Sequence, residues 1–289
     1  MPLPSDGAAP LTASPSPAME ARAYAAVVGG AVGDAAAARC HWQYDPKKLA
    51  EIVGDRDVAF YDGEPKCNPF YTVSPGSSTC YGDQLVTVAA SLAATAPEVD
   101  PSDVAAKLRE RFAESDYAEA IPRKKHYNYG NDQTARSPPI EGPWIHGTIE
   151  SFLKSQGLQI EVDDEDSSAD ALMRTIPVAA LAAVAGWDTE KLQKAVDDVV
   201  CVTQRNALAR DHAFAVARAL VDVIKGDDPK SSLQSVVAAA SDDESDQSSA
   251  KTVATALTAA ASHAHYAASI EVLRSGLGLQ DANPAKLIN

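Results

Sequence analysis

The sequence predicts an all-α fold, a single compact domain of packed, partly orthogonal helices. Three observations lead to this prediction. Apolar residues recur at helical spacing over most of the chain, capping residues and glycines punctuate these stretches, and no alternation of polar and apolar residues is long enough for a sheet strand. With 289 residues, 45% of them hydrophobic, the chain can bury the core that such a domain needs.

Composition and charge argue against several classes of partner. The formal net charge of -15 disfavours nucleic acid, because affinity for a phosphate backbone comes mainly from Lys and Arg. The same charge disfavours anionic membrane surfaces, and no uninterrupted apolar run is long enough to cross a bilayer. The four cysteines lack metal-binding or CxxC spacing, which predicts reduced thiols and a cytoplasmic location.

The chain is expected to divide into a tail and one domain. Residues 1–17 are rich in Pro, Ser and Ala without the features of a secretory signal, which predicts a disordered N-terminal tail. Residues 18–289 form the helical domain. Its first helix is almost entirely small or apolar up to Asp34, so we expect it to be buried on all sides. Gly29 and Gly33, one turn apart, are expected to let other backbones approach closely.

The remaining helices are predicted from apolar spacing and from their start and stop residues. Two long loops interrupt them, at residues 55–79 and 121–147, and such loops in compact domains are usually functional or disordered. The second loop carries a basic cluster, Arg123–His126, that is either a phosphate contact or a solvated turn. Pro177 lies inside one helix and predicts a kink or a break. These helices are expected at residues 46–52, 80–96, 102–112, 148–154, 169–185, 189–202, 208–224, 229–240 and 250–274.

Two aspartates lie at ends of the apolar helices. Asp34 needs a partner, because burying an unpaired carboxylate costs several kcal/mol. It either caps a neighbouring backbone turn or takes part in a ligand site. Asp83, just before the next apolar helix run, presents the same choice between an N-cap and a ligand-binding carboxylate.

The loops add side chains that can carry acid and base chemistry. His41, after the first helix, can act as an acid or base near neutral pH, or can be a hydrogen-bonded packing histidine. Glu141, His146 and Trp144 place a carboxylate, an imidazole and a stacking surface in one Gly- and Pro-rich loop. The alternative is a loop fixed by its own hydrogen bonds. We predict His41 and Glu141 as catalytic residues and Trp144, His146 and Asp34 as ligand-binding residues.

Several ordered blocks between about residue 22 and residue 210 carry a family resemblance. They are Gly33–Asp45, Pro69–Leu85, Pro139–His146, Ala171–Leu181 and Val202–Gln204. These blocks resemble the ADP-ribosylglycohydrolase superfamily, in the branch that includes selenoprotein J and the J-type lens crystallins. The last eighty residues resemble it only loosely.

The resemblance implies an all-α domain that binds ADP-ribose and hydrolyses its glycosidic bond to a protein side chain or small group, assisted by two magnesium ions. The implied partner is an ADP-ribose-like small molecule or an ADP-ribosylated protein. Where the family has a Thr-Asp-Asp metal motif, this chain has Cys80–Asp83, so Asp83 is the metal ligand that the resemblance offers. His41 stands where catalytic members usually carry glutamate, and residues 18–289 lack the family's C-terminal Asp-x-Asp-Thr motif.

Two functions therefore follow from the sequence. One is an ADP-ribosylglycohydrolase-like enzyme that hydrolyses the glycosidic bond of an ADP-ribose conjugate. The other is a catalytically degenerate, J-crystallin-like protein with a structural or nucleotide-binding role.

Overall fold

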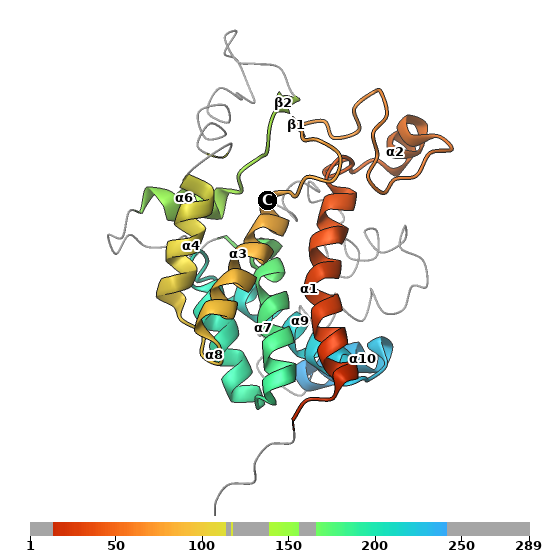
Figure 1. Cartoon of the computed structure of the whole chain (residues 1–289). Helices are drawn as coiled ribbons and strands as arrows, with labels where there is room; N and C mark the ends of the chain where they lie inside the picture. Colours follow the sequence, from red (N-terminus) through yellow and green to blue (C-terminus); the bar gives the residue numbers. More distant parts are fainter. Residues whose placement is uncertain (1–13, 114–116, 118–138, 156–165, 242–289) are drawn as a thin grey trace, which may run out of the picture.

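The computed structural model describes residues 14–113, 117, 139–155 and 166–241, and these form the all-α fold that the sequence predicts (Figure 1). A 3-10 turn, η1 (Ala169–Ala171), leads into one of the helices. The helices are α1 (Pro17–Ala37), α2 (Pro46–Val53), α3 (Cys80–Thr95), α4 (Pro101–Ala113), α6 (Gly147–Lys154), α7 (Leu172–Ala185), α8 (Thr189–Val200), α9 (Ala207–Lys225) and α10 (Pro229–Ser241).

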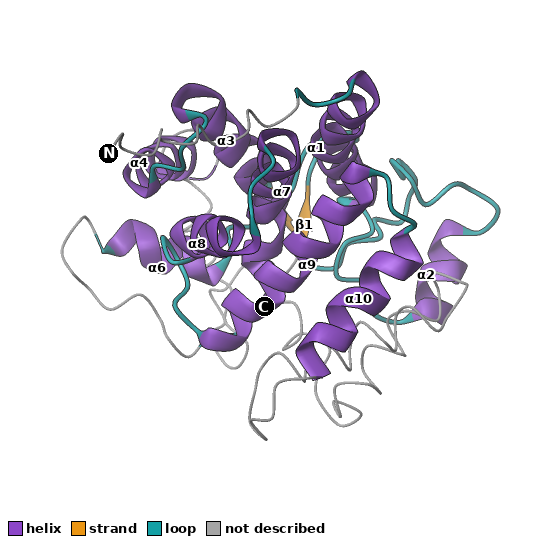
Figure 2. Ribbon diagram, turned by 90° about the horizontal axis from the view of Figure 1, so that it is seen from below, coloured by secondary structure: helices purple, strands orange, loops and turns teal. Residues whose placement is uncertain are grey.

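Helix α7 forms the centre of the described part, packed against α1, α3, α8 and α9 (Figure 2). Small alanines on several of its sides let these neighbours approach, and Val178, Ala179 and Ala182 are almost fully buried. Of the kink or break predicted at Pro177, the break is wrong, because α7 continues through this residue to Ala185. Gly186 ends the helix in the left-handed conformation.

Aspartate side chains cap the starts of two helices. Asp45 accepts hydrogen bonds from the backbone of Lys47 and Lys48 at the start of α2, and Asp188 does the same for α8. The expected N-cap role of Asp83 is wrong, because Thr79 caps α3 and Asp83 lies within the first turn. The predicted tail up to residue 13, the basic cluster and the helix at 250–274 lie outside the described residues.

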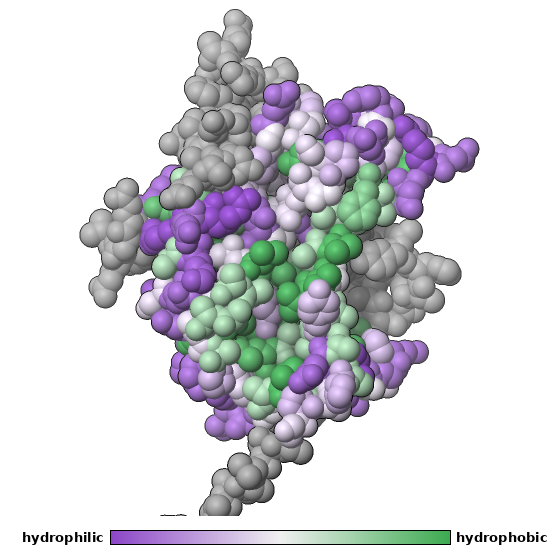
Figure 3. All heavy atoms as spheres, viewed as in Figure 1, coloured by the Kyte–Doolittle hydropathy of each residue, from purple (hydrophilic) through white to green (hydrophobic). Residues whose placement is uncertain are grey.

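The predicted burial of α1 on all sides is also wrong. One face of the helix contacts α3, α7 and α9, whereas Tyr24 is 72% exposed and Val32 is 51% exposed. Figure 3 shows a hydrophobic surface over α1 and α3. Val28 of α1 and Val86 of α3 are both exposed and line the same shallow depression. The prediction failed because a helix rich in Ala and Gly has no polar face that would identify its solvent side.

The glycine that permits close packing of α1 is Gly30, one position from the predicted pair. A Cβ atom at Gly30 would lie 2.8 Å from Leu85 Cδ1 and 3.1 Å from Ile176 Cδ1, so α3 and α7 pack against its backbone. A Cβ atom at Gly29 or Gly33 would meet nothing within 4 Å.

This difference leads to a prediction for the two neighbouring glycines. Gly29→Ala is expected to raise the free energy of unfolding by about 0.5–1 kcal/mol, because alanine favours the helix and contacts nothing new. Gly30→Ala is expected to lower it by about 1 kcal/mol through overpacking against Leu85. Urea unfolding followed by circular dichroism measures both, and equal effects of the two substitutions would contradict the described packing.

A short pairing joins the two predicted long loops. Strand β1 (Tyr71–Thr72) runs parallel to β2 (Ile140–Glu141), with Tyr71 opposite Ile140 and Thr72 opposite Glu141. The Gly142 backbone N–H donates to the Thr72 carbonyl at 2.9 Å and extends the contact. Two-residue strands have no periodicity that a sequence pattern can reveal, which is why they were not predicted. Among the described helices, none is both long and apolar enough to cross a membrane.

Candidate functional site

The site is built around the N-terminus of α3, where Asp34 from α1 meets the capping residue Thr79. Asp34 Oδ2 accepts a hydrogen bond from Thr79 N at 2.7 Å, and Oδ1 accepts one from Thr79 Oγ1 at 2.6 Å. Burial raises the pKa of Asp34, the bonds from Thr79 lower it, and the charge of nearby Asp83 raises it again, with a net increase. Of the two interpretations of Asp34, these contacts support the cap of a neighbouring turn.

Gly82 makes this contact possible. A Cβ atom at this position would overlap Asp34 Oδ2, so the carboxylate of Asp34 occupies the space that a side chain at Gly82 would need. The first turn of α3 therefore packs directly against a carboxylate from α1.

Gly82→Ala is therefore expected to lower the free energy of unfolding by about 1–2 kcal/mol, because the methyl group displaces the Asp34 carboxylate from Thr79. Thermal or urea unfolding measures the effect. The control is Gly82→Ala in the Asp34→Ala variant, which has no carboxylate for the new methyl group to meet. Gly82→Ala should lower the free energy of unfolding less in this variant than in the wild type. Equal losses in both backgrounds would mean that Gly82 and Asp34 are not coupled.

On the other side of the first turn of α3, Asp83 is held by a cation and a phenol. Its Oδ2 atom accepts a hydrogen bond from Arg111 Nη2 at 2.6 Å and one from Tyr117 OH at 2.8 Å. The Arg111 guanidinium also lies 4.7 Å from the centroid of the Tyr117 ring. Burial raises the pKa of Tyr117, which keeps this hydroxyl a donor.

A depression of about 450 Å³ lies beside this ion pair, and we call it the Asp83 depression. This volume is within the range of small-molecule sites. Besides Asp83, Arg111 and Tyr117, it is lined by residues from loop 55–79 and from the segment after β2: Thr72, Val73, Ser74, Ser77, Ser78, Gly142 and Pro143.

His41 lies at a second depression, which Asp34, Tyr81 and Asp170 also line. Its Nδ1 atom is 2.8 Å from Tyr71 OH, and its ring packs 5.5 Å from the ring of Tyr81. Burial, with a smaller effect of His146, lowers the pKa of His41 to about 4. His41 is thus a neutral, packed imidazole near neutral pH, which corresponds to the packing interpretation.

Trp144 packs within an aromatic cluster next to His41. The centroid of its ring is 5.5 Å from that of Trp42, which also makes edge contacts with Phe70 and Tyr71. Trp42 has a positive φ of 62°, which an L-residue adopts at a cost and which here directs the indole into the cluster. Glu141, predicted as catalytic, is exposed on β2 and lines neither depression.

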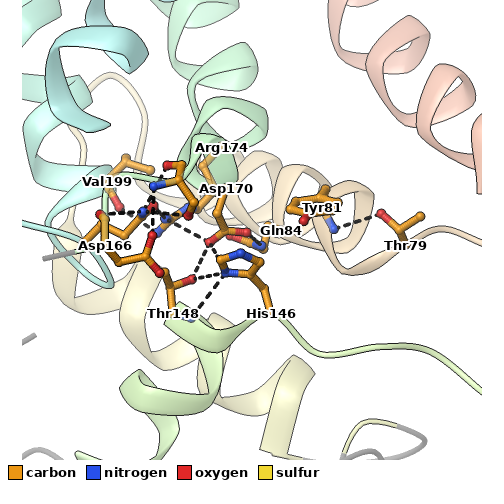
Figure 4. Close-up of polar contacts among 11 residues, drawn as sticks. Thr79, Tyr81, Gln84, His146, Thr148, Asp166, Asp170, Arg174 and Val199 are labelled. Atoms are coloured by element: carbon orange, nitrogen blue, oxygen red, sulfur yellow. Dashed lines mark hydrogen bonds and ion pairs between the residues drawn. The ribbon is translucent and has the colours of Figure 1, made fainter. Parts of the chain in front are cut away.

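His146 caps α6 and belongs to a buried polar network below α3 (Figure 4). Its Nδ1 atom accepts a hydrogen bond from Thr148 N at 3.2 Å and lies 3.6 Å from Asp170 Oδ2. This fits the alternative of a loop fixed by its own hydrogen bonds. The predicted residues are therefore dispersed. Asp34 and His41 line one depression and Asp83 lines the other, whereas Trp144 lies in the aromatic cluster, Glu141 on β2 and His146 in the buried network.

Asp170 is the centre of this network. It accepts hydrogen bonds from Gln84 Nε2 at 2.7 Å and Thr148 Oγ1 at 2.5 Å, and the Arg174 guanidinium lies 3.8 Å away (Figure 4). Burial alone would raise the pKa of Asp170, but His146, Arg174 and the two hydrogen bonds together lower it. Arg174 also donates to the Val199 carbonyl at 3.2 Å.

Sequence reasoning did not identify Asp170, Arg111 or Tyr117 as site residues. Asp170 follows an acidic loop and has no local signal that it is buried. Arg111 lies on an amphipathic helix whose charged face is typical of solvent exposure. The available signal was Arg174, a cation within a strongly apolar helix, which requires a buried carboxylate partner.

The described residues do not fit a two-magnesium centre. Both oxygens of Asp34 accept hydrogen bonds from Thr79, and Asp83 is neutralised by Arg111. Within the described ranges, no three His, Cys, Asp or Glu side chains converge as metal ligands do. Mg²⁺ requires several converging oxygen ligands, so we derive no chemical step through it.

The fold and this arrangement around α3 define an all-α domain of the ADP-ribosylglycohydrolase type. The model of the ADP-ribosylglycohydrolase family matches residues 15–285, and the chain belongs to this family. Two curated relatives are crystallin J1B and crystallin J1A of Tripedalia cystophora, 28% and 27% identical over 215 residues. Each alignment covers 72% of this chain and 60% of the relative's length.

Proposed function

We propose that the protein binds an ADP-ribose-like nucleotide in the Asp83 depression, without hydrolysis by a two-magnesium mechanism. The ion pair between Asp83 and Arg111 carries this proposal. It places a guanidinium against the acid that the family motif offers to a metal, so this carboxylate has a cationic partner without a metal ion. This proposal corresponds to the second function considered from the sequence, a catalytically degenerate protein that binds a nucleotide.

The lining of the depression suits a phosphorylated ligand. Arg111 has a side chain that is 34% exposed, so its guanidinium borders the solvent as well as Asp83. Guanidinium groups bind phosphate oxygens through charge-assisted hydrogen bonds. The hydroxyl groups of Ser74, Ser77 and Ser78 add neutral donors around the same space.

Isothermal titration calorimetry of the full chain with ADP-ribose tests the proposal, once with magnesium chloride and once with a chelator. We expect the same affinity in both conditions, because Asp83 is already paired with Arg111 and the proposed binding involves no metal ion. Incubation with an ADP-ribosylated peptide, followed by chromatography, should show no magnesium-dependent release of ADP-ribose.

Substitutions then locate the ligand. Arg111→Met should weaken ADP-ribose binding by about tenfold or more, through loss of the charged donor. Arg109→Met is the matched control, because Arg109 lies on the same helix but packs over Phe152. This variant should bind ADP-ribose with the affinity of the wild type. Ser77→Ala provides a milder second variant at the same depression, and a thermal melt verifies that each variant is folded.

The other outcomes separate the alternatives. Binding or peptide hydrolysis that requires magnesium would overturn the proposal and support the glycohydrolase function. No binding in either condition would also overturn it, and would favour a structural role of the kind that the name of the crystallin relatives describes for them.

A further inference from the structure

Two cysteines lie together at the edge of the site and take no part in the function proposed above. Cys40 follows α1, and Cys67 lies in loop 55–79. Both belong to one small apolar cluster, whose other members are Leu49, Ile52, Val53 and Tyr61.

Backbone contacts hold the two segments side by side. The Asn68 backbone N–H donates to the Arg39 carbonyl at 2.9 Å, one residue away from each cysteine. The Gln43 side chain donates to the Cys67 carbonyl at 3.4 Å on the other side. Because Cys40 packs against the cluster that contains Cys67, and the segments on either side are joined by these hydrogen bonds, the two side chains lie in the same small apolar region.

The two thiols differ in their access to solvent. Cys67 is 2% exposed, whereas Cys40 is partly exposed, so a reagent in solution reaches Cys40 first. Burial and the neighbouring Cys67 thiol raise the pKa of Cys40 to about 12. The thiolate is therefore scarce near neutral pH, and its reaction with an oxidant is slow.

We propose that Cys40 and Cys67 form a reversible disulfide bond in the presence of a small disulfide such as glutathione disulfide. The Cys40 thiolate attacks one sulfur of glutathione disulfide, which releases one glutathione and leaves a mixed disulfide. The Cys67 thiolate then attacks the Cys40 sulfur and releases the second glutathione. The protein loses two protons and two electrons, and one glutathione disulfide is reduced to two glutathione molecules.

This bond would restrain the wall of the site that contains His41. Asn68, next to Cys67, accepts hydrogen bonds from the backbones of Phe70 and Tyr71 at 2.9 and 3.2 Å. Tyr71 in turn contacts His41, next to Cys40, at 2.8 Å. The disulfide therefore closes a covalent ring around a wall that is otherwise held by hydrogen bonds and aromatic contacts.

Peptide mapping of the full chain tests the proposal. The protein is incubated with excess glutathione disulfide at mildly alkaline pH, alkylated with iodoacetamide, digested with trypsin and analysed by mass spectrometry. We expect peptide 40–47 linked to peptide 67–107, two of the four thiols lost, and both changes reversed by dithiothreitol. Amide hydrogen exchange around His41 and Tyr71 should slow in the oxidised protein.

The controls identify the sulfur atoms. Peptide 67–107 also contains Cys80, so the link must persist in Cys80→Ala and disappear in Cys67→Ser and Cys40→Ser. Wild-type mapping decides the question even where the Cys67 variant folds poorly. Full alkylation of Cys40 and Cys67 after oxidation, a glutathione adduct that never proceeds to a link, or a link through Cys80 or Cys201 would overturn the proposal.

Discussion

Replacing Arg174 with methionine is expected to lower the free energy of unfolding by about 3–5 kcal/mol. The substitution keeps the volume of the side chain but leaves the carboxylate of Asp170 buried without its guanidinium partner. It also removes the hydrogen bond to the Val199 carbonyl at 3.2 Å, which links α7 to α8. Urea unfolding followed by circular dichroism measures the loss.

The matched control is Arg210→Met, which removes a closer but partly exposed ion pair. Arg210 donates two hydrogen bonds to Asp197, both at 2.8 Å, yet solvent screening should limit the loss to about 1 kcal/mol. The double variant Asp170→Asn with Arg174→Met should recover part of the stability, because it removes both buried charges. If Arg174→Met lowered the free energy of unfolding no more than Arg210→Met does, the buried pair of Asp170 and Arg174 would not be a main source of stability.

The helices could be predicted because their signals are local. Asp45 and Asp188 cap helices that begin within three residues of them, and Val104, Leu108 and Phe112 form the buried face of α4 as their spacing indicates. Which face of a helix is covered by its neighbours depends on the tertiary structure. An alanine-rich helix such as α1 has the same sequence pattern whether it is buried or at the surface, so the pattern could not identify its exposed face.

The site could be predicted only in part, because its contacts join residues far apart in the chain. Asp34 and Thr79 are 45 residues apart, and Gln84 and Asp170 are 86 residues apart. The sequence indicated that Asp34 requires a partner, but not which residue supplies it. The sequence drew attention to Asp83, whereas its partner Arg111 lies on a helix whose charges resemble an ordinary solvated face.

Lowering the pH from about 6.5 to about 4 is expected to destabilise the protein by about 2–3 kcal/mol through His41 alone. In the unfolded chain, His41 takes up a proton as the pH falls below about 6.5. In the folded protein it stays neutral until about pH 4, because burial disfavours the charged ring. The unfolded state therefore binds more protons within this interval, and stability decreases as the pH falls.

The His41→Phe variant isolates this effect, because phenylalanine retains the ring contacts with Trp42 and Tyr81 but cannot be protonated. It should be less stable than the wild type near neutral pH, since it loses the hydrogen bond to Tyr71, and the difference should shrink or reverse toward pH 4. His212, whose pKa burial also lowers, titrates in both proteins and cancels in the comparison. Parallel curves of unfolding free energy against pH for the two proteins would show that His41 does not lose its proton affinity on folding, and would favour an open, protonated imidazole at the site.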